Sequence, residues 1–66
     1  MTDFQQGALV AIGLLVRLHD QPGMAADVLI SMGLHKSDCS SLDEFDKASL
    51  HKLVGERPSI ALRNLK

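Results

Sequence analysis

The sequence predicts an all-α fold, a single domain over residues 1–66 with three helices and a short apolar C-terminal segment. First, turn-forming residues divide the chain into three segments whose apolar residues recur at helical spacing. Second, Ala8 to Leu18 is apolar at every position except Gly13 and Arg17, so this segment needs apolar cover on all sides. Third, so short a chain buries only about 60% of the surface that its unfolded form exposes. A helical homodimer accounts for all three observations.

The first helix is expected over residues 3–19. Thr2 and Asp3 are both good N-cap residues, and the turn formers Asp20, Pro22 and Gly23 follow its far end. Its apolar run ends at Arg17, well short of the roughly 20 residues that a membrane-spanning helix needs. We therefore expect a buried helix and no association with a membrane.

The second helix is expected over residues 22–33. Proline is tolerated in the first turn, where its missing N–H would have no partner in the helix, so Pro22 fits the start. Gly33, followed by Leu34, fits a C-terminal cap. Between them the apolar residues recur at helical spacing: Met24, Val28, Leu29 and Met32.

The third helix is expected over residues 42–54, with Ser41 and Glu44 forming a capping box and Gly55 ending it. The residues expected on its buried face are Leu42, Phe45, Ser49 or Ala48, and Leu53. Those expected to face water are Asp43, Glu44, Asp46, Lys47 and Lys52.

The tail, residues 56–66, is compatible with either a short helical turn or an extended strand. Pro58 stops any continuation of the third helix, and Ser59 could cap one more turn. Ile60, Leu62 and Leu65 are too apolar for a free tail, so we expect them to dock on their own subunit or on a partner.

Composition argues against several functions. A net charge of −1 gives no strong field to attract nucleic acid or an anionic membrane. Phe4 and Phe45 are the only aromatic residues, so little material exists for stacking on bases. The single cysteine, Cys39, favours a reducing compartment, and the start of the chain has no basic signal-peptide region. We expect a cytoplasmic protein.

No enzyme or metal site is expected. Cys39 with His35 or His51 is the only conceivable nucleophile–base pair, and it lies in a Ser/Asp-rich segment expected to be mobile and exposed. His35 and Cys39 are four residues apart, but the paired short spacings of zinc sites are missing. We therefore expect no catalytic residue, no cofactor and no metal ligand.

A helix-turn-helix is the alternative interpretation, carried by the segment Ala25 to Leu42 and the helix after it. The helix that would read DNA holds more carboxylates than basic residues, which repels phosphate. Arg57, Arg63 and Lys66 could still supply a basic patch. A dimeric DNA-binding regulator therefore stays open as the second hypothesis.

Self-association through the first helix is the preferred interpretation. A stripe of small residues would let a second helix approach closely, and a bulkier stripe would supply most of the burial. The expected interface consists of Gly7, Ala8, Leu9, Ala11, Ile12, Leu15 and Val16.

From Gly7 to Leu29, GALVAIGLLVRLHDQPGMAADVL resembles small accessory, early-region proteins of lambdoid bacteriophages and their prophages. The resemblance covers about the first half of the chain. It implies a short product that binds a host or phage protein, in the host cytoplasm, without catalysis of its own. It transfers no functional residue.

The function expected is therefore protein–protein interaction without catalysis, by a homodimer that binds an unidentified protein. The candidate surface for that protein combines the acidic part of the third helix with the apolar tail: Asp43, Glu44, Asp46, Ile60, Leu62 and Leu65.

Overall fold

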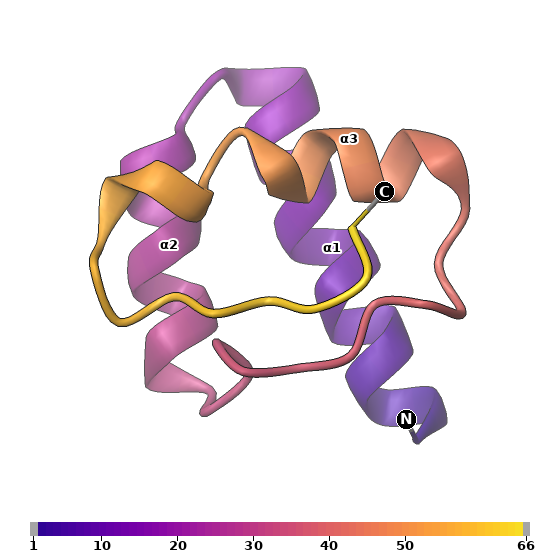
Figure 1. Ribbon diagram of the computed structural model, residues 1–66. Coiled ribbons are helices and arrows are strands. Elements are labelled where there is room, and N and C mark those ends of the chain that lie inside the picture. The colour runs from indigo at the N-terminus through magenta and orange to yellow at the C-terminus, as the bar shows by residue number, and fades with distance from the viewer. Residues whose placement is uncertain (1, 66) are drawn as a thin grey trace.

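The computed structural model describes residues 2–65, and within them the fold is all-α, as the sequence predicted. Three α-helices, α1 (Asp3–His19), α2 (Pro22–Ser31) and α3 (Glu44–His51), precede a 3-10 turn, η1 (Val54–Glu56). Figure 1 shows α1 passing behind α3, with α2 on the other side of the molecule and the tail crossing the front. No helix in the described residues is long and apolar enough to cross a membrane.

The start of α1 is fixed by Thr2, one of the two cap residues expected. The Thr2 hydroxyl accepts a hydrogen bond from the Gln5 backbone N–H at 3.1 Å, and the Gln5 side chain accepts one from the Thr2 N–H at 3.0 Å. This capping box satisfies two backbone donors that otherwise lack partners in the first turn. The helix stops at Asp20, whose left-handed φ of 49° turns the chain away.

The end of α2 is a Schellman motif, in which Gly33 follows the C-cap as expected. The Gly33 N–H donates to the Ile30 carbonyl at 2.9 Å, and the Leu34 N–H donates to the Leu29 carbonyl at 3.0 Å. Gly33 has a φ of 71°, a conformation that favours glycine. The motif ends the helix at Ser31, and Leu34 folds back into the core beside Leu29.

The expected bounds of α3, residues 42–54, are wrong at both ends: the helix spans Glu44–His51, and Gly55 lies within η1 instead of ending it. Asp43, and not Ser41, is the N-cap, and its carboxylate accepts the Asp46 N–H at 2.8 Å. Asp43 caps as well as serine does, and a later start lets Leu42 enter the core before the helix begins.

The expected buried face of α3 is also partly wrong. Phe45 is 73% exposed and Ala48 is exposed, whereas Leu50 is fully buried. Ser49 is buried because α1 passes close to it, and a Cβ added at Gly13 would lie 3.4 Å from the Ser49 Cβ. The close approach of α1 to α3 at Gly13 therefore selects a face of α3 on which small Ser49 adjoins large Leu50.

The sequence left open whether the tail is helical or extended, and whether it docks on its own subunit or on a partner. In the structure the tail is extended and docks on its own chain. Backbone hydrogen bonds join it to the α2–α3 linker: Ala61 N–H to His35 carbonyl, 2.7 Å; Arg63 N–H to Ser37 carbonyl, 3.0 Å; Cys39 N–H to Arg63 carbonyl, 2.8 Å. Asp38 and Arg63 form a parallel β-bridge, and the yellow end of the chain in Figure 1 runs along the salmon-coloured linker. Ile60 anchors the tail in the core.

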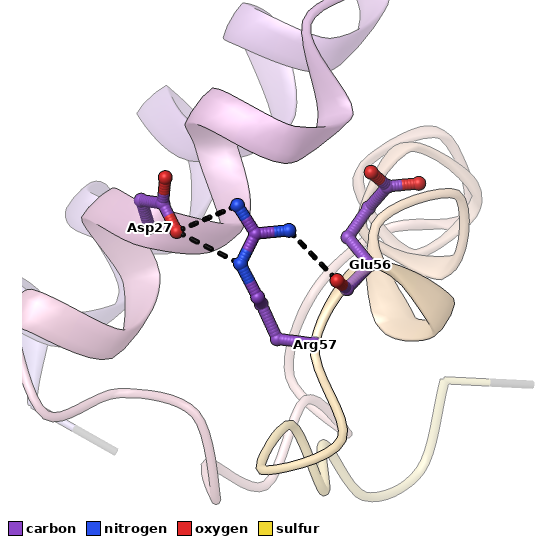
Figure 2. Close-up of polar contacts among 3 residues, drawn as sticks. All are labelled: Asp27, Glu56 and Arg57. Atoms are coloured by element: carbon purple, nitrogen blue, oxygen red, sulfur yellow. Dashed lines mark hydrogen bonds and ion pairs between the residues drawn. The ribbon is translucent and has the colours of Figure 1, made fainter.

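Arg57 connects the beginning of the tail to α2, as Figure 2 shows. Its Nε and Nη2 donate to one carboxylate oxygen of Asp27 at 3.1 and 3.0 Å, and its Nη1 donates to the Glu56 carbonyl at 2.7 Å. The Arg57 side chain is 40% and that of Asp27 62% exposed, so water screens the pair and its contribution to stability is small. Arg57 is thus paired in the fold and adds little to any basic patch.

The helix-turn-helix of the alternative interpretation is not formed by these residues. Residues 32–43 separate α2 from α3, whereas the motif joins its helices by a turn of about three or four residues. The linker is long because it pairs with the tail before Leu42 returns the chain to the core.

Candidate functional site

An apolar groove lies on the surface between α1 and α2. Its volume is about 520 Å³, and its lining is almost wholly apolar. Asp3, at one end, supplies the only charged side chain of that lining. The lining residues are Asp3, Phe4, Gly7, Ala8, Ala11, Ile12, Leu15, Val28 and Met32.

The α1 side of this groove continues along the helix as what we call the α1 outer stripe. The stripe consists of Phe4, Ala8, Ala11, Leu15 and Leu18. Successive members are alternately four and three residues apart, the spacing of the apolar seam of a coiled coil. Phe4 is 71% and Leu18 is 67% exposed, and Ala11 is exposed between them. The stripe has the pattern of a helix–helix seam with no second helix on it.

The α2 wall of the groove carries exposed apolar residues at four-residue intervals. Met24, Val28 and Met32 all lie on the exposed side of α2, and the last two line the groove. A methionine side chain is flexible and polarizable, so it adapts its shape to an apolar partner. Together the wall and the α1 outer stripe form one apolar surface across two helices.

The expected self-association residues divide between the core and this surface. Leu9, Ile12 and Val16 are buried in the core of their own chain, beneath α2 and α3. Gly7 and Ala11 are exposed, and Ala8 and Leu15 are half-buried at the edge of the groove.

Sequence reasoning missed the larger members of the apolar surface, Phe4, Leu18, Val28 and Met32. The heptad-like spacing of the α1 outer stripe is the signal that could have found the first two. The helical spacing of Val28 and Met32 marked them as apolar residues of one helix, but it could not show that they stay exposed, because only the fold shows which face of α2 is covered.

The expected partner surface does not form a single exposed patch. Asp43 and Glu44 are exposed, whereas Asp46 is half-buried. Ile60 is buried in the core, so its inclusion was wrong. The half-buried Leu62 and Leu65 line a separate cleft, with His51, Val54 and Asn64.

The carboxylates of that region differ in their environment. Partial burial, with the negative charge of Asp43 as a further cause, raises the pKa of Asp46. The pKa of Asp38 is lowered, first because Asn64 donates a side-chain hydrogen bond to it at 2.8 Å, and then because the Ser40 N–H donates at 3.0 Å. Asp38 therefore acts as a charged acceptor that holds the tail.

Cys39 is fully buried, which corrects the expectation that it lies in an exposed, mobile segment. Burial raises the pKa of its thiol, and the neighbouring charge of Asp38 adds to the effect. A high thiol pKa and a closed environment make a poor nucleophile. Within residues 2–65, no three His, Cys, Asp or Glu side chains are grouped so that they could hold a metal ion.

Comparison with protein-family models, with curated proteins and with solved structures finds no match to this chain.

Proposed function

We propose that the chain is a protein–protein interaction protein without catalytic activity, which forms a homodimer through the α1–α2 apolar surface. The observation that carries the proposal is the exposure of Phe4 and Leu18 on a stripe with coiled-coil spacing. Small soluble proteins rarely expose a contiguous apolar surface, and such surfaces mark sites of association.

The chemistry of the groove favours a protein over a small polar ligand. Sites for small molecules combine an apolar lining with several polar groups that fix orientation. Here Asp3 is the one charged lining residue, and it lies at the end of the groove, at the first position of α1. An amphipathic helix needs only the apolar wall.

In this proposal the dimer binds a further protein through another surface, the acidic start of α3. Asp43 and Glu44 are exposed there, and exposed Phe45 follows them directly and gives the surface an apolar anchor. The resemblance of residues 7–29 to phage accessory proteins agrees with such a role, in the cytoplasm of a host. No feature of the fold favours the alternative of a DNA-binding regulator.

Sedimentation equilibrium tests the homodimer, using Ala11→Arg and Ala48→Arg as a matched pair. Both alanines are exposed and lie within helices, but only Ala11 belongs to the α1 outer stripe. We expect the wild type and Ala48→Arg to dimerise at micromolar concentration and Ala11→Arg to be monomeric. A wild type that remains a folded monomer at high micromolar concentration would refute the proposal. Substitution of Ile12 is unsuitable, because Ile12 belongs to the core.

A further inference from the structure

We infer that the groove between α1 and α2 takes the α1 helix of a second copy of this chain, antiparallel to the first, with the two-fold axis near Ala11. The inference rests on the proposed homodimer and adds its orientation and the residues that meet. Three features of the groove, in size, charge and polarity, support it.

The distribution of side-chain size along α1 favours the antiparallel orientation. The N-terminal half of the stripe region is small at Gly7, Ala8 and Ala11, and the C-terminal half is bulky at Leu15 and Leu18. With the axis near Ala11, Leu15 of one copy lies over Gly7 of the other, where a Cβ would meet no atom within 4 Å. Bulky Leu15 then opposes small Gly7 on either side of the axis, so the two helices can approach closely around Ala11.

The charges at the two ends of α1 point to the same orientation. Asp3 lies in the first turn, and Arg17 and His19 lie in the last. An antiparallel pair brings the acidic first turn of each copy beside the basic last turn of the other, and it also opposes the two helix dipoles favourably. A parallel pair would place acid against acid and base against base.

The polarity of the groove is consistent with an apolar helix as its occupant. Asp3 is the only charged lining residue, and in this orientation it lies at the end of the seam, near the second copy's His19. Phe4 of each copy meets Leu18 of the other, so the two large exposed residues of the stripe cover each other. The packing therefore leaves no charged group buried beneath the second helix.

Disulfide trapping tests the orientation, in a Cys39→Ala background so that only introduced thiols react. Phe4→Cys and Leu18→Cys chains are oxidised with diamide, each alone and then as a mixture, and linked dimers are counted by mass. We expect efficient linkage in the mixture, and at Ala11→Cys alone, but little linkage for Phe4→Cys or Leu18→Cys alone. Efficient linkage of both single variants alone, without preference for the mixture, would overturn the antiparallel arrangement.

A second measurement keeps the native cysteine, because Cys39→Ala removes a buried side chain. Asp3→Lys should lower the dimer affinity about two- to fivefold at low salt, and adding His19→Glu to the same chain should restore it. In a parallel dimer the double variant would remain weakened. Absence of any dimer in sedimentation refutes the proposed homodimer itself, whereas a dimer that fails these orientation tests refutes only this inference.

Discussion

At the scale of single residues, the packing of α1 against α3 depends on a glycine, Gly13, at their point of close approach. Small residues of α1 were expected to admit a second copy, but the close approach within the chain occurs at Gly13, against Ser49 of α3. A Cβ there would lie 3.4 Å from the Ser49 Cβ and 3.7 Å from the Asp46 carbonyl oxygen, which are ordinary contact distances. Gly13 therefore has room for a methyl group and nothing larger.

Gly13→Ala and Gly13→Leu should consequently have opposite effects on stability. Alanine fits and favours the helix by up to about 1 kcal/mol over glycine, so Gly13→Ala should raise the free energy of unfolding. Leucine would force α1 and α3 apart at the cost of roughly 1–3 kcal/mol. Urea unfolding followed by circular dichroism measures both, and a destabilised Gly13→Ala would show that the helices lie closer than described.

Cys39 should be unreactive in the folded protein. Its thiol is fully buried and its pKa is raised by that burial, so little thiolate is present near neutral pH. Alkylation by iodoacetamide at pH 7.5 should be slow in buffer and fast in urea. Rapid modification of the native protein would contradict the burial of this residue.

At the scale of elements, α3 shows why the sequence predicted a helix in this segment but assigned its buried face partly wrongly. The apolar residues between positions 42 and 54 are compatible with two overlapping helical faces, one that includes Phe45 and one that includes Leu50. The expected face was the one through Phe45, and phenylalanine is among the residue types most often fully buried. The buried face of α3 is determined by α1, which approaches closely at Gly13 and requires a small residue, Ser49, opposite it. No local pattern within α3 reveals that requirement.

Phe45→Ala and Leu50→Ala measure which face of α3 is buried. Phe45 is largely exposed, so its removal should change the free energy of unfolding by less than about 0.5 kcal/mol. Leu50 is fully buried, and its removal should cost about 2–5 kcal/mol. Equal losses in chemical denaturation would mean that Phe45 packs against the core after all.

Docking of the tail should depend on pH through Asp38. Hydrogen bonds from Asn64 and Ser40 lower the pKa of this carboxyl, so it favours the folded tail while ionised. That contribution is complete above the ordinary pKa of 3.8 and is lost as the pH falls through the lower folded value.

Amide signals of Ala61 and Arg63 in NMR spectra, recorded from pH 6 downward, should report the tail loosening below pH 3.8, before core signals such as that of Leu9 change. In Asp38→Asn this pH dependence should disappear. Tail signals that move only together with the core would contradict a separate role for Asp38.

At the scale of the whole molecule, the sequence predicted the all-α fold and the bounds of α1 because caps and turns are local signals, whereas α2 and α3 are shorter than expected. Thr2, Pro22 and Gly33 occupy the structural positions expected of them. The side of α1 that faces its own chain was not predictable in the same way, since α1 is apolar around most of its circumference. Leu9, Ile12 and Val16 were therefore assigned to self-association, although they build the core.

The small size of the chain does not by itself require a dimer. The accessible surface is 4077 Å², close to the roughly 4,100 Å² that a folded monomer of 7.2 kDa has on average. A second copy is thus not needed to complete the core. The case for self-association rests on the α1 outer stripe and the α2 wall, which stay exposed once the core is built.

We expect two copies of the chain to meet at this apolar surface, and methyl NMR spectra across a dilution series would report that contact. Between millimolar and low micromolar concentration, we expect the shifts of Ala8, Ala11, Leu15, Leu18 and Met32 to change together along one binding curve. Methyl signals of Leu50 and Leu62 should stay constant, because they lie in the core and at the tail. Spectra that do not change with concentration, or changes confined to the tail, would contradict the account.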